Sequence, residues 1–392
     1  MNILLVVPEY PPEVVGGGGV VYENLFQQYM LAHQVTIVSA TWNRRRWADE
    51  SVGVPVQRDR IYRHMLMHNP GDQAYLRSVL PLTIPGTIKR IRVLNENHFD
   101  VAHLHGYGYL SVDETAWMLH QRKIPYVFTC HGLPVSPQGM GRIGLSSYMM
   151  YQNHVASRTV ARASKITAIS HAASKLPGNR EVDVIYNGAA PLPSPRQEDL
   201  NWADDIIGSA SPEKVVLAAG RIVRSKGFDL LLSALGLVPG LWDKLIILGD
   251  DGGERLPLLQ QAASLGFERR ISFPGRATRS QLSALLPKVK ILVVPSRTEP
   301  FGLIALEGLM SGLTTIVSDL DGLKEVFNDL PEWRVNPFDT GTFASILRRE
   351  LLLSQREPAL EHRIQLTLRR FSWAQIADQY INVLEAAAES RP

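Results

Sequence analysis

Short apolar segments that alternate with helical segments constrain the fold of this chain more than any other feature. The apolar segments are rich in β-branched residues, which are typical of buried strands. They fall into two series: Asn2–Val7, Gln34–Ala40, Asp100–His105, Pro125–Cys130, Lys165–Ile169 and Asp183–Tyr186, and then Val215–Ala219, Lys244–Leu248, Arg270–Phe273, Lys290–Val294 and Thr314–Val317. Because helical segments separate most of them, the sequence predicts an α/β protein whose parallel sheets are covered by helices on both faces.

A proline-rich connection lies between the two series. The stretch Pro191-Leu-Pro-Ser-Pro contains three prolines in five residues, and such a stretch is stiff and cannot continue a helix. We therefore place a domain boundary here, with residues 1–190 in an N-terminal domain and residues 191–372 in a C-terminal domain. Ligands of doubly wound sheets bind beyond the carboxyl ends of the strands, so two facing domains would enclose a cleft.

The composition agrees with a large enzyme. With 45% hydrophobic and 20% charged residues, the 392-residue chain can bury a full core in each domain. The net charge of +3 gives no reason to expect nucleic acid as a partner. The single cysteine, Cys130, excludes an internal disulfide and fits a reducing compartment. Since no apolar run reaches the roughly 18 residues of a membrane span, we expect a cytoplasmic protein.

The segment from Glu299 to Glu307 carries the most specific functional signal. It reads Glu-Pro-Phe-Gly-Leu-Ile-Ala-Leu-Glu and follows an apolar strand segment, which places Glu299 on a loop at the end of that strand. Glu307 comes about two helical turns later, on roughly the same helix face. The backbone amides of Phe301, Gly302 and Leu303 open this helix and can face an anion. The two carboxylates can accept hydrogen bonds from sugar hydroxyl groups, and the backbone amides of the turn can donate to phosphate. Together they indicate a site for a nucleotide sugar.

This segment resembles the signature of the retaining glycosyltransferases of family 4, the glycosyl transferases group 1. Members of that family carry a glutamate, seven residues and a second glutamate, usually with Pro-Phe-Gly after the first. They have the GT-B fold, in which two Rossmann-like, doubly wound parallel-sheet domains face each other across a cleft. The resemblance therefore implies this fold, with a C-terminal helix at residues 373–392 that crosses back to the N-terminal acceptor domain.

A basic segment after the first strand of the second series supports the resemblance. It reads Gly-Arg-Ile-Val-Arg-Ser-Lys-Gly, from Gly220 to Gly227. Arg221 and Lys226 lie five positions apart at a strand–helix junction, where two cations can clamp a diphosphate and neutralise it as it leaves. An exposed basic turn is the alternative. Two further positions resemble family residues near the nucleotide: Gly249 and Arg276.

A cluster of four glycines, residues 16–19, follows the first strand. Glycine permits backbone conformations and close approaches that other residues do not, and the helix after the cluster offers free amides to phosphate. The spacing does not match a dinucleotide-binding fingerprint, which would need a further glycine at Val21 or Tyr22. A flexible loop tip is the alternative. The resemblance implies that this loop, with Gly17 and Gly18, contacts the donor diphosphate and the acceptor.

Three histidines lie near strand ends. His103 and His105 alternate on one strand, and His131 follows the next. No nearby carboxylate or cysteine completes a metal-ligand pattern, so we predict no metal site and assign His103 and His105 to structure. The resemblance implies that His131 lies at the donor sugar, near its 6-hydroxyl group and the reacting carbon. For His131 a structural role at a strand end is the alternative.

The resemblance implies a retaining, metal-independent transfer of a sugar from a UDP- or GDP-sugar to an acceptor hydroxyl, without a cofactor. The acceptor would attack from the face that the diphosphate leaves. His131, Arg221, Lys226 and Glu299 would be the catalytic residues, of which Glu299 holds sugar hydroxyls, and Glu307 would hold the ribose. The other donor-binding positions would be Gly17, Gly18, Gly220, Gly249, Arg276, Phe301, Gly302 and Leu303.

Two rival functions stay open at this point. One is a sugar-nucleotide epimerase or hydrolase on the same fold, and the other is a non-catalytic nucleotide-sugar binder. For Glu299 and Glu307 the alternative to ligand binding is a salt bridge or a solvated helix face. Turnover and detection of a transferred glycoside separate these functions.

The acceptor is less constrained by the sequence. Arg44, Arg45 and Arg46 lie between Trp42 and Trp47, and cations among aromatic residues can mark a membrane interface, an anionic acceptor or simply a solvated loop. The acceptor is therefore left open as a sugar, another small molecule or a lipid-linked molecule. Peripheral contact with the inner face of the membrane is left open with it.

One loop departs from the family pattern. After the last predicted strand the family often has two glycines before a glutamate, but here the chain reads Leu320-Asp321-Gly322-Leu-Lys-Glu325. Asp321 replaces the first glycine, which puts the backbone geometry of that loop in question.

Overall fold

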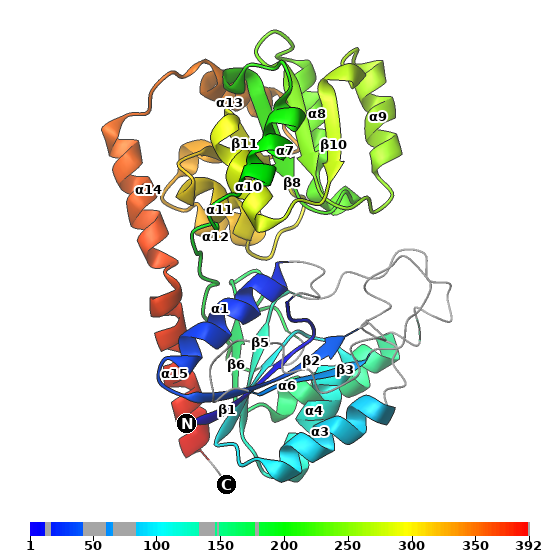
Figure 1. Cartoon of the computed structure of the whole chain (residues 1–392), viewed down its shortest axis with the longest axis vertical. Coiled ribbons are helices and arrows are strands. Elements are labelled where there is room, and N and C mark those ends of the chain that lie inside the picture. Colours follow the sequence, from blue (N-terminus) through cyan, green and yellow to red (C-terminus); the bar gives the residue numbers. More distant parts are fainter. Residues whose placement is uncertain are drawn as a thin grey trace. The chain divides into compact units, whose positions relative to one another are not determined.

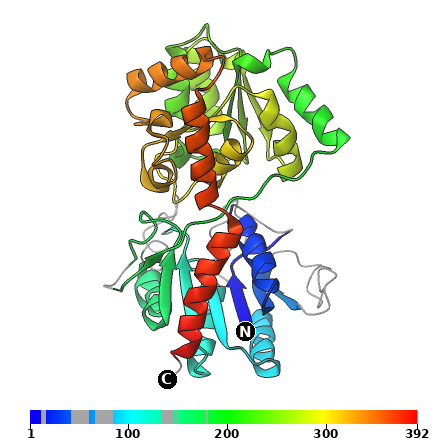
Figure 2. The same cartoon turned by 90° about the vertical axis from the view of Figure 1, so that its left-hand side faces the viewer.

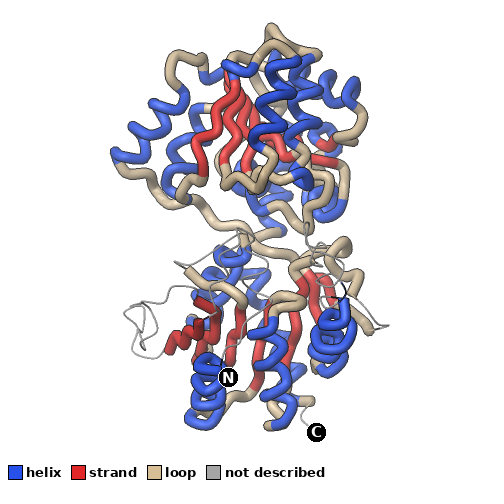
Figure 3. The backbone as a smooth tube through the Cα atoms, turned by 90° about the vertical axis from the view of Figure 1, so that its right-hand side faces the viewer, coloured by secondary structure: helices blue, strands red, loops and turns tan. Residues whose placement is uncertain are grey.

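The computed structural model of this chain describes residues 1–11, 17–41, 60–65, 84–132, 146, 149–176 and 180–390. They form two compact units, one made of Met1–Gly188 with Trp373–Pro392 and the other of Ala189–Ser372 (Figure 1). In each unit a sheet lies between layers of helices (Figure 3). None of the described helices combines the length and the apolar character that crossing a membrane would need.

The first unit contains a seven-stranded parallel sheet in the order β3-β2-β1-β4-β5-β6-β7. Its strands are β1 (Asn2–Val7), β2 (Gln34–Thr41), β3 (Arg60–Met65), β4 (Val101–His105), β5 (Tyr126–Cys130), β6 (Lys165–Ala168) and β7 (Asp183–Val184). Its helices are α1 (Gly18–Met30), α3 (Ile84–Glu96), α4 (Leu110–Gln121), the π-helical segment Gln152–Ala156, α6 (Ser157–Arg162) and α15 (Trp373–Glu389).

The helices of the first unit pack on both faces of its sheet. α1 and α15 lie side by side on one face, where α15 reaches β4 and β5 (Figure 2). The hydroxyl of Tyr380 on α15 donates to the carbonyl of Ile185, at 3.3 Å. Strands β4 and β5 are buried along their whole length, because parallel strands between two helical layers have no solvent face.

The second unit contains a six-stranded parallel sheet in the order β10-β9-β8-β11-β12-β13. Its strands are β8 (Val215–Ala219), β9 (Lys244–Leu248), β10 (Ile271–Gly275), β11 (Ile291–Val294), β12 (Thr314–Ser318) and β13 (Arg334–Val335). Its helices are α7 (Gln197–Ile207), α8 (Phe228–Gly236), α9 (Arg255–Ser264), α10 (Arg279–Leu285), α11 (Leu303–Met310), α12 (Asp321–Val326), α13 (Thr340–Leu352) and α14 (Pro358–Arg370).

The predicted α/β fold with parallel sheets is confirmed. Each predicted strand is present, with its ends shifted by two residues at most. Two strands that the sequence did not predict, β3 and β13, occupy sheet edges. β13 consists of only two residues, which is too short for a periodic pattern to reveal.

Both sheets reverse their strand order at one point. In the first unit this happens between β1 and β4, and in the second between β8 and β11. At such switch points the loops that leave the two strands diverge, and their carboxyl ends leave a crevice for a ligand. We therefore expect a ligand site at the loops that follow these strands.

Candidate active site

The candidate site of the second unit lies where β8 and β11 end. A short 3-10 turn, Arg224–Lys226, follows β8, and Gly227 continues into α8 with a left-handed backbone, φ 67°. A Cβ atom at Gly227 would lie 2.0 Å from the carbonyl oxygen of Pro295, just after β11. Only glycine therefore lets the turn that carries Lys226 approach the end of β11 so closely.

Lys226 and Glu299 form an ion pair at this junction. The distance from Lys226 Nζ to Glu299 Oε2 is 2.5 Å, and the two side chains are 23% and 13% exposed. The structure thus brings together two residues that the sequence assigned to the catalytic set from separate loops. Since both groups keep some contact with solvent, a ligand that carries both an anion and hydroxyl groups can reach them.

Arg297 braces the two loops that carry this pair. Its guanidinium donates two hydrogen bonds of 2.6 Å to the carboxylate of Asp229, in the first turn of α8. Its backbone amide donates to the carbonyl of Ser225, at 2.8 Å. A bidentate arginine–carboxylate contact is geometrically specific, so Arg297 holds the Lys226 turn against the Glu299 loop. The sequence did not single out either member of this contact.

Glu307 is buried on α11 and pairs with Arg279. The guanidinium of Arg279, at the start of α10, donates to Glu307 Oε1. Burial raises the pKa of Glu307, and the charge and hydrogen bond of Arg279 oppose that rise. Arg279 thus lies at the candidate site, although the sequence did not single it out. A signal was present, because Thr278 and Gln281 form a capping box that marks a helix start directly after β10, at the same sheet edge.

Asp321 adopts the backbone conformation that the family pattern assigns to glycine. Its φ angle is 47°, in the left-handed region. Its Oδ2 atom accepts a hydrogen bond from the amide of Glu299 at 3.2 Å, and the amide of Gly322 donates to the carbonyl of Glu299 at 3.0 Å. The loop after β12 is thus tied to the loop of Glu299, and Asp321 adds a carboxylate beside it.

Two of the predicted glycine positions are explained by the backbone itself. Gly249 directly follows β9 and has φ 144°, and a Cβ atom there would lie 1.9 Å from the carbonyl oxygen of Gly220. The two loops therefore touch through their backbones. Arg221 follows Gly220 and is exposed, and Arg276 is exposed directly after β10. All four positions lie at the carboxyl edge of neighbouring strands, as the sequence predicted.

The turn that opens α11 offers its backbone rather than its side chains. The ring of Phe301 is buried and packs edge-on against Phe371, with ring centroids 5.7 Å apart. Gly302 has φ 92°, and a Cβ atom on it would lie 2.3 Å from a methyl group of Leu323. Leu303 is the first residue of the helix. A ligand can therefore use the amides of this turn, while the Phe301 ring belongs to the core.

In the first unit, the described part of the glycine cluster begins α1. The amide of Gly19 donates to Glu9 Oε1 at 3.2 Å, so one amide at this helix start already has a carboxylate partner within the chain. A Cβ atom on Gly18 would lie 3.1 Å from the hydroxyl of Tyr22. Gly17 precedes α1 and is exposed. Gly16 and the segment from Trp42 to Trp47, which the sequence singled out, lie outside the described residues.

His131 follows β5 and hydrogen-bonds to His105 on the neighbouring β4. The distance between His105 Nδ1 and His131 Nε2 is 2.8 Å. The ring of Tyr22 on α1 lies against both histidines, with centroid distances of 5.1 and 5.3 Å. Burial lowers the pKa of His131 to about 4. His131 is therefore neutral near pH 7 and can offer a hydrogen bond but no positive charge.

The described residues offer neither a metal site nor a cysteine nucleophile. Within them, no group of three or more histidine, cysteine, aspartate or glutamate side chains is arranged to hold a metal ion. Cys130 is buried at the end of β5, and burial raises the pKa of its thiol to about 11. The thiol therefore stays protonated at neutral pH and is a poor nucleophile.

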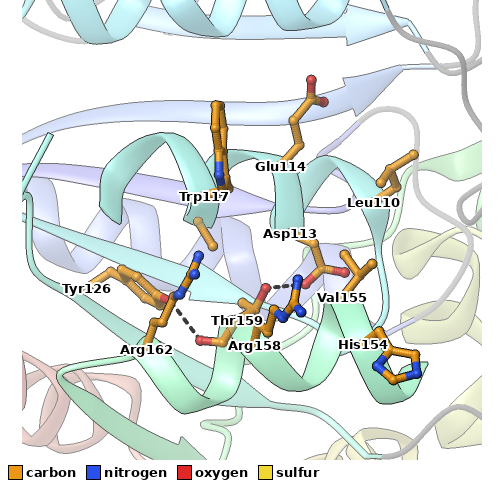
Figure 4. Close-up of a pocket in the computed structure, with 11 residues that line it drawn as sticks. Leu110, Asp113, Glu114, Trp117, Tyr126, His154, Val155, Arg158, Thr159 and Arg162 are labelled. Carbon is orange, nitrogen blue, oxygen red and sulfur yellow. Dashed lines mark hydrogen bonds between the residues drawn. The ribbon is translucent and has the colours of Figure 1, made fainter. Parts of the chain in front are cut away.

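A separate pocket of about 300 Å³ lies in the first unit, between α4 and the helical segment 152–162 (Figure 4). The carboxylate of Asp113 in its wall accepts hydrogen bonds from Tyr151 and, at 2.6 Å, from Thr159. Burial raises the pKa of Asp113 to about 6. The described lining of this pocket contains no residue that the sequence assigned to the donor site.

Two family models match this chain. The model described as Glycosyltransferase Family 4 matches residues 15–191, and the model described as Glycosyl transferases group 1 matches residues 203–353. Among curated proteins, an uncharacterized glycosyltransferase of Methanocaldococcus jannaschii is 26% identical over an alignment that covers 99% of each chain.

Solved structures resemble this chain in fold over nearly its whole length. A sucrose-phosphate synthase of Thermosynechococcus elongatus matches with a TM-score of 0.74 at 19% identity, over 98% of both chains. The HepE protein of Anabaena, solved in complex with UDP-glucose, matches with a TM-score of 0.70 at 20% identity, over 98% of this chain and 100% of its own. At such identities the likeness concerns the fold alone.

Proposed function

This chain belongs to family 4 of the glycosyltransferases, the glycosyl transferases group 1 with the GT-B fold, and we propose that it is a retaining, metal-independent enzyme that uses a UDP- or GDP-sugar. Of these donors, a UDP-hexose is the first to test, because the structurally similar HepE was solved with UDP-glucose. The acceptor supplies a hydroxyl group and is a sugar, another small molecule or a lipid-linked molecule.

The Lys226–Glu299 pair carries this proposal. An ammonium and a carboxylate 2.5 Å apart, at the switch point of a doubly wound sheet, fit the two chemically different ends of a donor. The ammonium matches the diphosphate, and the carboxylate matches sugar hydroxyls. A purely structural salt bridge has no need to lie at the crevice where such sheets bind ligands.

Positive charge on the second unit would stabilise the departing diphosphate. Arg221 and Lys226 follow β8, and the amides of Gly302 and Leu303 open α11 at the neighbouring strand. Such preorganised donors lower the barrier because they match charge that grows as the glycosidic bond breaks. When the diphosphate binds, Lys226 would contact it while its partner Glu299 turns to the sugar.

The bond changes need no side-chain nucleophile. The acceptor oxygen would bond to the anomeric carbon from the face that the diphosphate leaves, which retains the configuration. The bond between that carbon and the phosphate oxygen breaks, and the proton of the acceptor hydroxyl leaves with the diphosphate. Glu299 would orient sugar hydroxyls, His131 would contact the sugar as a neutral hydrogen-bonding group, and Glu307 would hold the ribose.

A two-stage experiment tests the function. Thermal-shift measurements with UDP-, GDP-, ADP- and TDP-sugars identify the donor, since a ligand that binds only the folded state raises its apparent stability. The protein is then incubated with that donor and a panel of free sugars, sugar phosphates and lipid-linked acceptors, and NMR determines the anomeric configuration of the product. A glycoside of retained configuration supports the proposal. An inverted product, or release of free or epimerised sugar alone, would contradict it.

A further inference from the structure

One of the two histidines that the sequence assigned to structure, His105, contacts His131, and the other, His103, contacts His105. Alternation along β4 places His103 and His105 on one face of the sheet, and both are fully buried. Their ring centroids lie 4.0 Å apart. Tyr22 and Tyr29 of α1 and Tyr380 of α15 pack against these rings.

His103 has partners for both of its ring nitrogens. Its Nδ1 atom lies 3.0 Å from the hydroxyl of Tyr29, and its Nε2 atom lies 2.7 Å from the hydroxyl of Thr129. The Thr129 hydroxyl in turn lies 2.6 Å from that of Thr167. A ring with hydrogen bonds at both nitrogens cannot rotate, so His103 presents a fixed surface against which the ring of His105 packs.

His105, by contrast, has a hydrogen-bond partner for only one of its two ring nitrogens among the residues that the structure describes. Its Nδ1 atom bonds to Nε2 of His131 at 2.8 Å. Its Nε2 atom is buried and has no hydrogen-bond partner within the described residues. This asymmetry determines where the protons of the pair lie.

A neutral imidazole has one N–H donor and one bare acceptor nitrogen. If His131 donated to His105, the proton of His105 would lie on Nε2, as a buried N–H group without an acceptor. If His105 donates from Nδ1 instead, its Nε2 atom carries no proton and is only an acceptor without a partner. Buried donors without partners are rarer than underused acceptors, and leaving one unpaired is costly. The second arrangement is therefore the favoured one.

We propose that His105 is a positioning residue that donates from Nδ1 to Nε2 of His131 and so holds His131 in the tautomer with its proton on Nδ1. This inference rests on the proposed role of His131 at the donor sugar. With Nε2 occupied by His105, the side of the His131 ring that is left for a substrate carries an N–H group. His131 then donates a hydrogen bond to a substrate oxygen, and it cannot act as a base through Nε2.

Nitrogen NMR tests the tautomer without any turnover. The protein is labelled with ¹⁵N at its 11 histidines, and a His131→Ala variant assigns the signals of His131. We expect a protonated Nδ1 and a bare Nε2 in His131, and a protonated Nδ1 in His105. The opposite tautomer in His131, or a doubly protonated ring at neutral pH, would overturn the proposal.

A matched pair of variants tests the positioning role. In His105→Asn the amide is bonded to Cγ and can donate from the place of Nδ1, whereas in His105→Gln it lies one bond further, at the place of Nε2. We expect His105→Asn to keep kcat within about threefold of wild type and His105→Gln to lower kcat about tenfold or more with little change in KM, because a displaced His131 no longer meets its target. Thermal unfolding of both variants controls for folding.

The outcomes separate this inference from the proposed function. Equal losses of kcat in the two variants, or no loss in either, would show that the contact is only structural. If wild-type protein transfers no sugar at all, the proposed function fails, and the nitrogen signals still decide the tautomer. If wild-type protein is active and His105→Gln matches it, the inference alone fails.

Discussion

Lys226 Nζ lies 2.5 Å from Glu299 Oε2, although the two residues are 73 positions apart in the sequence. The contact exists because β8 and β11 are neighbours in the sheet, so the loops that leave them meet. It gives the ammonium a partner before a ligand arrives. A diphosphate that binds Lys226 would take the place of this carboxylate, so the ammonium would keep an anionic partner.

Replacing Lys226 with alanine should lower kcat by about 10²- to 10³-fold. Losing one preorganised hydrogen-bond donor that stabilises charge in the transition state typically has an effect of this size. Lys288→Ala is the matched control, because it also removes a lysine that is paired with a carboxylate, here that of Asp204, in the same unit. We expect the control to keep wild-type kinetics. Turnover of Lys226→Ala close to that of the control would refute its role.

The two glutamates should differ in which part of the donor they bind. Glu299→Gln should weaken binding of the nucleotide sugar more than binding of the nucleotide diphosphate, because the diphosphate lacks the sugar. Glu307→Gln should weaken both ligands, by about 1–3 kcal/mol each, because a charged hydrogen bond to the ribose is lost. Titration calorimetry with both ligands measures this. The same loss for both ligands in both variants would rule out this division of roles.

Gly249→Ala should destabilise the protein by about 1–3 kcal/mol, since the position has φ 144° and a Cβ atom would lie 1.9 Å from the Gly220 carbonyl oxygen. Gly240→Ala is the control, because a Cβ atom at Gly240 would meet nothing within 4 Å. Urea unfolding compares the two. Equal stability of both variants would mean that the loops after β8 and β9 do not touch as described.

Because of Asp113, the free energy of unfolding should fall as pH rises. Burial raises its pKa to about 6 from an ordinary 3.8, so between these values the folded state binds the proton more tightly than the unfolded state does. Ionisation then costs stability, by about 2 kcal/mol between pH 4.5 and 7.5. Asp113→Asn removes this contribution, and unfolding at several pH values should show a gain for the variant that grows with pH. A pH-independent difference would contradict it.

Activity should survive an excess of chelator. The diphosphate needs counter-charge, and we expect Arg221 and Lys226 to supply it without a divalent ion. The Asp319-Leu-Asp321 sequence, the nearest match to a metal-binding pair, has other partners, since Asp319 pairs with Arg334 and Asp321 accepts from the Glu299 amide. Loss of turnover in EDTA that manganese restores would disprove this expectation.

The sequence alone was enough to predict what depends on neighbours along the chain. Runs of apolar, β-branched residues located the main strands. The Glu299–Glu307 segment placed one carboxylate on the loop before a helix and the other about two helical turns later. The glycines at 220, 249 and 302 marked turns that need unusual backbone conformations or close contacts, and the structure shows such requirements at each of them. These features are local, because side-chain direction repeats every few residues along a strand or a helix and depends only on neighbours in the sequence.

The contacts between loops were decided by the tertiary structure. The Arg279–Glu307 pair, the hydrogen bond from the Glu299 amide to Asp321 and the His105–His131 contact each join loops or strands from separate parts of the chain. Strand order puts β8 beside β11 and β4 beside β5, and no local pattern encodes that order. A side chain acquires its partner, its burial and its pKa only when distant segments pack together, because desolvation and charge pairing depend on distance in space rather than on distance along the chain.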